Sequence, residues 1–232
     1  MATYLSLVKD LARESGSLSP SAITTVLGLT GRPEKMAAWV SRAYIDIQRE
    51  RPGQWLWMKA EATGTLTSGA PRYTGLSFSL TRWGSWTTDS RNLLPVSIYE
   101  PAKGVSDEGE LRQIDYDYWY ARYARKQHDA GRPVDYAISP AGEMCFGPTP
   151  AQNYTVRFMY FKSPQVLAAN GDVPEMPEAF HDLIVWEARR KLLISDSAFN
   201  EANFELPEIM RLRFQLECEQ LDSARLVGDP IA

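Results

Sequence analysis

The chain has 232 residues, of which 44% are hydrophobic and 23% charged, and its formal net charge is −4. This composition excludes an intrinsically disordered protein, and a chain of this length can bury about 70% of its unfolded surface in one large or two small domains. The acidic balance provides no chain-wide basic surface and disfavours tight DNA binding.

Cysteine content and hydropathy limit the location of the protein. Cys145 and Cys218 lie far apart and lack metal-ligand spacing, so we expect two reduced, packed thiols. No segment approaches about 20 apolar residues, and the N-terminus lacks the apolar core of a signal peptide. The sequence therefore predicts a soluble protein made in the cytoplasm, without membrane association.

The N-terminal part predicts two amphipathic helices. In the first, apolar residues share one face between Thr3, placed to cap its start, and Gly16, placed to end it. The second has Pro33 in its first turn and ends before Pro52. Its predicted core residues lie on one face: Trp39, Val40, Tyr44 and Ile47. Trp55 and Trp57 follow two residues apart, as core residues on one face of a strand.

The middle of the chain, from residue 60, predicts short strands separated by turns. Segment 115–127 is ambiguous, because it either completes a strand begun at Leu111 or turns into a short helix. Residues 134–161 predict a three-stranded meander with turns at prolines and glycine. In its last strand, alternate residues from Tyr154 to Tyr160 are apolar, which indicates one buried face.

The C-terminal part predicts two more helices. The first, after Pro177, is apolar on several sides and should be surrounded; its predicted core residues are Phe180, Ile184 and Trp186. The second begins at Pro207 and carries two apolar stripes. One contains Ile209, Leu212 and Leu216; the other contains Met210, Phe214, Cys218 and Leu221. Either one stripe meets a second molecule, or the helix lies between two neighbours in the same chain.

The order of elements, helices then strands then helices, predicts an α+β protein. Its fold class is a helical bundle formed by the N- and C-terminal helices with an inserted antiparallel β-rich region. We expect residues 1–59 and 170–224 in the bundle domain, residues 60–169 in the inserted domain and residues 225–232 as a C-terminal tail.

The search for reactive groups gives no catalytic residue, metal ligand or cofactor. His181 lacks a second histidine nearby, so we expect a surface or capping role rather than metal binding. The acidic pairs Asp107-Glu108 and Asp115/Asp117 are typical of solvated charges; as a catalytic pair, either would point to a glycan hydrolase. We therefore expect a protein that is not an enzyme.

Aromatic residues provide the main alternative. They are concentrated in the strand region: Trp83, Trp86, Tyr116, Tyr118, Trp119, Tyr120 and Tyr123. Flat rings beside polar groups can stack on sugars or nucleobases, so an aromatic-rich carbohydrate-binding or tail-associated recognition module is the alternative function. A β-rich core or an oligomer interface also uses large aromatics, and we favour that interpretation.

The sequence resembles the head-to-tail adaptor, or connector, proteins of tailed bacteriophages. The resemblance rests on the order of four stretches, residues 3–16, 37–58, 131–167 and 171–188. It implies a structural virion protein of the neck, between the capsid portal and the tail, made in the host cytoplasm. It also implies a homo-oligomeric ring, a dodecamer, that docks on the portal protein, extends the DNA channel and attaches tail or neck proteins.

Several residues are candidates for partner binding within such a ring. A ring needs two different surfaces on each subunit, and the second stripe of the last helix can provide one, with Met210, Phe214 and Leu221. In adaptor families a C-terminal arm often engages the portal, which suggests the same role for the apolar tail residues Leu226, Val227 and Ile231. The acidic net charge is compatible with DNA that passes through without specific binding.

Overall fold

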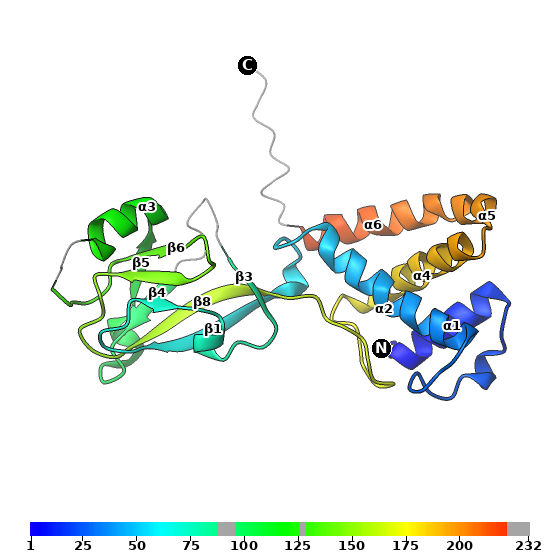
Figure 1. Cartoon of the computed structure of the whole chain (residues 1–232), viewed down its shortest axis with the longest axis horizontal. Helices are drawn as coiled ribbons and strands as arrows, with labels where there is room; N and C mark the ends of the chain where they lie inside the picture. Colours follow the sequence, from blue (N-terminus) through cyan, green and yellow to red (C-terminus); the bar gives the residue numbers. More distant parts are fainter. Residues whose placement is uncertain (88–95, 126–128, 222–232) are drawn as a thin grey trace, which may run out of the picture. The chain divides into compact units, whose positions relative to one another are not determined.

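A computed structural model describes residues 1–87, 96–125 and 129–221 of the protein. The chain forms two compact units (Figure 1). One unit combines Met1–Met58 with Pro164–Ala232 and is helical; the other, Lys59–Ser163, contains the strands.

The first helix, α1 (Tyr4–Ser15), has the predicted ends. The Thr3 side chain accepts a hydrogen bond from the Ser6 amide, and Ser6 bonds back to Thr3, which satisfies backbone groups that a helix start leaves unpaired. At the other end Gly16 adopts φ 61°, a left-handed conformation that glycine enters without steric cost. After a single turn, η1 (Pro20–Ala22), helix α2 (Arg32–Glu50) begins with Pro33 in its first turn, as predicted.

The tryptophans after α2 do not form a strand face, so that prediction is wrong. Trp55 lies in an irregular position between the turn at residues 52–54 and a short 3-10 helix, η2 (Leu56–Met58), which contains Trp57. The Trp55 indole N–H donates to the Ile47 carbonyl of α2 at 3.1 Å, and the two indole rings stack with centroids 4.4 Å apart. This hydrogen bond folds the segment back onto α2, so the first strand begins only at Lys59.

The C-terminal helices complete the helical unit. They are α4 (His181–Ser195), preceded by η6 (Glu178–Phe180), then α5 (Phe199–Phe204) and α6 (Leu206–Gln220). Helix α4 packs against α1, α2, α5 and α6, which explains its apolar residues on several sides (Figure 1). The buried core of the unit includes Leu7, Val8 and Leu11 from α1 and Leu183 and Ile184 from α4.

The other unit contains one sheet of eight described strands. In chain order they are β1 (Lys59–Leu66), β2 (Arg72–Tyr73), β3 (Trp83–Trp86), β4 (Val96–Tyr99), β5 (Gly109–Gln113), β6 (Asp135–Ile138), β7 (Met144–Gly147) and β8 (Tyr154–Lys162). The spatial order is β1-β8-β4-β5-β6-β7-β2, and β3 also pairs with β8. Short helices interrupt the strands: η3 (Leu76–Phe78), η4 (Gly104–Asp107), α3 (Tyr116–Trp119) and the π-helix η5 (Tyr120–Ala124).

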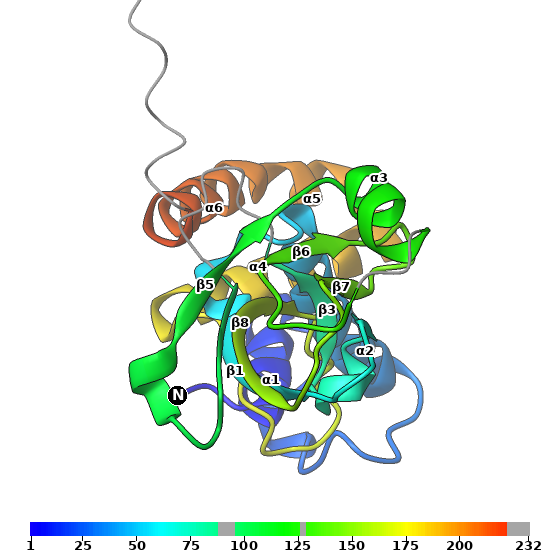
Figure 2. The ribbon, with the colours of Figure 1, turned by 90° about the vertical axis from the view of Figure 1, so that its left-hand side faces the viewer.

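The predicted fold class is therefore wrong. The strand region is a mixed eight-stranded sheet with its own core, rather than an antiparallel region inserted into a helical bundle. The pair β5 and β6 is parallel, because the chain between them crosses over through α3 and η5 (Figure 2). A parallel pair requires such a crossover, and residues 116–124 are the helical part of it.

The predicted meander is also wrong in its last step. Strands β6 and β7 form an antiparallel pair, but β8 pairs with β1, β4 and β3 and not with β7. Pro148 and Pro150 lie between β7 and β8 and lack the N–H groups that a tight hairpin would use. The alternation within β8 is as predicted, because Tyr154, Val156 and Phe158 are buried while their neighbours are half-buried.

The sheet is covered on both faces at β6 and β7. One face joins the main core of the unit through Tyr136, Met144 and Phe146. On the other face Ala137 and Cys145 pack against Trp119 of α3. Figure 2 shows α3 lying beside β6. Burial on both faces explains why every residue of β7 is buried.

Candidate interaction surface

Helix α6 has one packed face and one bare face. Ile209, Leu212 and Leu216 are buried inside the helical unit, and Leu216 is only 1% exposed. Met210 and Phe214, in contrast, are 66% and 67% exposed. Among the described residues, no neighbour in the chain covers the second stripe. Within the described residues the helix therefore does not lie between two neighbours of the same chain, and contact of this stripe with a second molecule stays a prediction.

The bare face extends beyond α6 in both directions. Phe204, the last residue of α5, is 85% exposed, and Cys218 near the end of α6 is exposed. We define the α6 stripe as Phe204, Met210, Phe214 and Cys218; Leu221, just after the helix, is half-buried. Exposed rows of large apolar side chains mark interaction sites in soluble proteins. The prediction that both thiols are packed is wrong for Cys218, because the packed face of α6 is rotated away from it.

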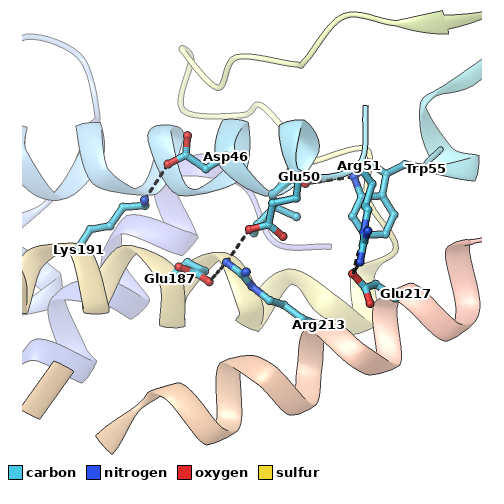
Figure 3. Close-up of polar contacts among 9 residues, drawn as sticks. Asp46, Glu50, Arg51, Trp55, Glu187, Lys191, Arg213 and Glu217 are labelled. Atoms are coloured by element: carbon cyan, nitrogen blue, oxygen red, sulfur yellow. Dashed lines mark hydrogen bonds and ion pairs between the residues drawn. The ribbon is translucent and has the colours of Figure 1, made fainter. Parts of the chain in front are cut away.

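A charged network holds α6 in place (Figure 3). The Arg213 guanidinium projects from α6 between two carboxylates, Glu50 of α2 at 2.7 Å and Glu187 of α4. Arg51, just after α2, donates twice to one oxygen of Glu217, from Nε at 3.1 Å and from Nη2 at 2.9 Å. These contacts join α6 to α2 and α4 and fix which of its faces points outward.

The network also carries an excess of negative charge. Burial raises the pKa of the Glu50 carboxyl; Arg213 opposes this rise, while Glu187 and Glu217 add to it. A second ion pair, from Lys191 of α4 to Asp46 of α2 at 2.7 Å, supports the same contact between helices (Figure 3). Arg213 is thus one cation shared by two carboxylates, and its removal would leave both without that partner.

The start of α6 has its own anchor. Glu205, which precedes the helix, is buried and lies 2.9 Å from the Arg189 guanidinium of α4. Burial raises the pKa of Glu205, and the charge of Arg189 lowers it. Anchors at both ends hold the α6 stripe as a fixed surface, and a preorganised surface loses less conformational entropy on binding.

The structure places most of the predicted core residues in the interior of the helical unit. Those that are buried are Val40, Tyr44, Ile47, Trp55, Phe180 and Ile184. Trp39, Trp57 and Trp186 are half-buried, and Trp39 and Trp186 each have an arginine near the ring face. The tail residues Leu226, Val227 and Ile231, and the whole of segment 225–232, lie outside the described residues.

The residues considered for catalysis have structural contacts. Asp107 accepts from Arg132 at 2.7 Å, and Glu108 accepts from the Ser97 hydroxyl at 2.5 Å. Asp115 caps α3 by accepting from the Asp117 amide. Of the surface or capping role expected for His181, the surface position is wrong, because the side chain is buried at the start of α4 with Nε2 3.0 Å from the Met176 carbonyl oxygen.

Most tryptophans of the strand region belong to its cores. Trp86 and Trp119 are buried, and the Trp86 indole N–H donates to the Gly142 carbonyl at 2.6 Å. Tyr118 and Tyr120 of the α3–η5 segment are exposed instead. Sequence reasoning grouped these aromatics together, whereas the structure divides them between core and surface. It also missed the arginines that stack on the two exposed tyrosines, although their spacing of four and five residues is visible in the sequence.

The described part of the chain has neither a cluster of metal ligands nor a helix that could span a membrane. Within residues 1–87, 96–125 and 129–221, no group of three or more His, Cys, Asp or Glu side chains could hold a metal ion. In the same part of the chain, no helix combines the length and the hydropathy that crossing a membrane would require.

A known protein family is similar to nearly the whole chain. The family model described as SU10 adaptor protein matches residues 2–215, so the similarity spans both units and reaches Phe214 on α6. No curated protein matches the chain.

Proposed function

The chain belongs to the SU10 adaptor protein family, and we propose that it is the subunit of a homo-oligomeric ring in the neck of a phage particle. Membership makes it a phage structural adaptor protein, associated with portal and tail proteins. In the proposed ring, one side docks on the portal, the centre extends the DNA channel and the other side attaches tail or neck proteins.

The α6 stripe is the observation that carries the ring proposal. A closed ring uses a heterologous interface, in which one surface of each subunit meets a different surface of the next. Met210 and Phe214 offer such a surface, and the contacts of Arg213 hold it in a fixed orientation. Exposed apolar rings on a rigid helix are typical anchors of protein interfaces.

The proposed role is structural rather than catalytic, and the protein would not bind DNA specifically. The net charge of −4 supports this second point, because like charges repel and weaken the attraction of a polyanion to the protein. The subunits would be made in the host cytoplasm and join the particle during assembly, after the portal vertex exists.

Residues 225–232 provide the proposed contact with the portal. The segment contains three apolar residues, Leu226, Val227 and Ile231, that can occupy pockets of a partner. We expect deletion of residues 225–232 to abolish binding to the portal protein of the same phage while leaving the thermal unfolding midpoint unchanged. Native mass spectrometry of the mixture with portal measures both the binding and the number of copies bound.

Two outcomes of that measurement contradict the proposal. If the truncated protein still binds, the tail is not the portal contact. If the full chain binds as one copy, rather than as a complete set around the portal, the ring itself is wrong. A chain with Leu226, Val227 and Ile231 all replaced by Ser is the matched control, because it keeps the tail length and removes only its apolar groups.

A further inference from the structure

The negative charge of the chain is not shared equally by its two units. Lys59–Ser163 contains 12 Lys and Arg against 11 Asp and Glu, whereas the rest of the chain contains 13 against 18. The strand unit therefore carries a formal charge of +1 and the helical unit one of −5, which together make the −4 of the whole chain. A surface that attracts a polyanion is thus expected on the strand unit.

Two exposed tyrosine–arginine pairs lie on the segment that crosses from β5 to β6. In the first, the Arg122 guanidinium lies 5.9 Å from the centroid of the Tyr118 ring and donates to its hydroxyl at 2.8 Å. In the second, the Arg125 guanidinium lies 5.7 Å from the centroid of the Tyr120 ring. Among the described residues, neither arginine forms an ion pair with a carboxylate, so both positive charges face solvent uncompensated.

The two pairs lie on opposite flanks of the α3–η5 segment. Residues 118 and 120 are two positions apart, which separates them by about 200° around a helix. Each arginine lies beside its own tyrosine, so the cations follow the tyrosines to the two flanks. The outer side between the flanks carries the small exposed residues Ala121 and Ala124. The segment is therefore a ridge with a low crest and a guanidinium on each flank, and we call residues 118–125 the α3–η5 ridge.

Buried contacts hold this ridge against the sheet. Trp119 is 1% exposed and packs on β6 and β7. The Tyr123 hydroxyl donates to one oxygen of the buried Asp135 carboxylate at 2.7 Å, and the other oxygen accepts from Arg112 at 2.9 Å. Both oxygens of Asp135 are thus engaged by residues other than Arg122. The ridge is fixed before any partner binds, and its two cations are held on their flanks.

A ridge with a cation on each flank is complementary to the major groove of duplex DNA. That groove is about 12 Å wide with phosphates along both edges, and a helix with its side chains is about 10–12 Å across. The alanines of the crest have no side-chain donor or acceptor that could read a base edge, so such a contact carries no sequence information. Asp117, exposed at the start of α3, opposes the attraction and keeps the contact weak.

We propose that the α3–η5 ridge contacts the phosphates of duplex DNA across the major groove, with Arg122 on one strand and Arg125 on the other. The inference deepens the proposed function, in which DNA passes through the ring, but the contact itself needs only one copy of the chain. It is a weak, sequence-independent contact that a passing duplex makes and breaks. An acidic protein surface, which also attracts arginine, is the competing partner.

The release of counterions gives this contact a measurable signature. Each phosphate that the protein neutralises contributes about −0.9 to the slope of log K against log salt. Binding of the full-length protein to a fluorescent DNA duplex, followed by anisotropy, should therefore weaken about 60-fold between about 10 and about 100 mM NaCl. Arg122→Gln and Arg125→Gln should each bind at least about tenfold more weakly at the lower salt and lose only about eightfold over the same range. Arg122→Lys should keep the wild-type slope, because it keeps the charge.

Arg42→Gln is the matched control. Arg42 is also an exposed arginine stacked on an aromatic ring, 6.0 Å from the centroid of Trp39, but it belongs to the helical unit. Its replacement should leave both the affinity for DNA and the salt slope unchanged. All these substitutions are at exposed positions, and matching urea midpoints would show that the variants fold.

Three results would overturn the inference. One is a wild type that does not bind the duplex even at about 10 mM NaCl. Another is an equal loss of binding in Arg42→Gln and in the two ridge variants. The third is binding to polyglutamate at least as tight as binding to the duplex, lost in the ridge variants, which would identify an acidic protein surface as the partner. None of these results contradicts the proposed ring itself, which copy number on the portal tests separately.

Discussion

Arg213 is the residue on which the orientation of α6 depends most. It contacts Glu50 and Glu187 from two other helices, whereas the contacts of Arg211 among the described residues are with Glu208 and Gln215 of its own helix. A partly buried cation shared by two carboxylates contributes more to stability than an exposed pair within one helix. The two arginines therefore form a matched comparison.

We expect Arg213→Met to lower the free energy of unfolding by about 2 kcal/mol at pH 7. Burial raises the pKa of Glu50 in the folded protein, so ionised Glu50 destabilises the fold and protonated Glu50 does not. The stability associated with protonated Glu50 is fully present below the ordinary glutamate pKa. It is lost as the pH rises through the pKa of Glu50 in the folded protein. The loss caused by Arg213→Met should therefore shrink near pH 4.5. Urea unfolding at the two pH values measures it.

Arg211→Met is the control, with an expected change below about 0.5 kcal/mol at both pH values, because surface pairs contribute little. If Arg213→Met lowered the free energy of unfolding equally at pH 7 and pH 4.5, the loss would not come from carboxylates left without a cation.

At Gly147 the surroundings leave no room for a side chain. A Cβ atom there would lie 2.4 Å from the Tyr123 ring, so the ring would have to move. We expect Gly147→Ala to destabilise the protein by about 2 kcal/mol. Burial raises the pKa of Tyr123 to about 12, with a further contribution from its bond to Asp135, and a displaced ring should titrate closer to 10. Spectrophotometric titration of the tyrosines measures this change.

Gly171→Ala provides the comparison for that substitution, because nothing lies within 4 Å of the position of its Cβ. The explanation would fail if both variants had the same stability as the wild type, or if the tyrosine titration of Gly147→Ala were unchanged.

At the scale of elements, the two faces of α6 should respond differently to substitution. Leu216→Ala creates a cavity in the helical unit and should cost about 3 kcal/mol. Phe214→Ser removes a larger side chain from the exposed face and should change the free energy of unfolding by less than about 0.5 kcal/mol. Thermal or urea unfolding of the two variants measures the contrast; comparable losses would mean that the α6 stripe is covered in solution.

Elements with local signals could be predicted from the sequence. The ends of α1 follow from Thr3 and Gly16, which act on backbone groups within one turn, and the face of β8 follows from strict alternation. The parallel pairing of β5 with β6 could not be predicted, because it depends on residues 116–124 forming a helix instead of extending a strand. Trp55 was misassigned for a related reason, since its hydrogen bond to Ile47 is a tertiary contact.

The candidate site, too, could be predicted only where local signals determine it. Periodicity separated the two stripes of the last helix, but only the structure shows which stripe is bare, because burial depends on the position of α4 and α2. Arg122 and Arg125 are visible in the sequence, yet their stacking on Tyr118 and Tyr120 depends on Trp119 and Tyr123 turning inward. Side-chain direction in a π-helix could not be derived from a 3.6-residue period.

At the scale of the whole molecule, the two units have separate cores. The helical unit carries the α6 stripe, and the strand unit contains the mixed sheet. A closed ring requires that each copy contact two neighbours through different surfaces, and the α6 stripe is proposed as one of them.

The central claim is that this protein connects the phage head to the tail as a structural subunit and not as an enzyme. Its most direct test is electron microscopy of particles made by a phage that lacks the gene for this chain and is supplied with a variant. We predict tailed particles with the wild type and with Phe214→Leu, which keeps the stripe apolar, and separate heads and tails with Phe214→Asp. Tailed, infectious particles in the complete absence of the protein would contradict the claim.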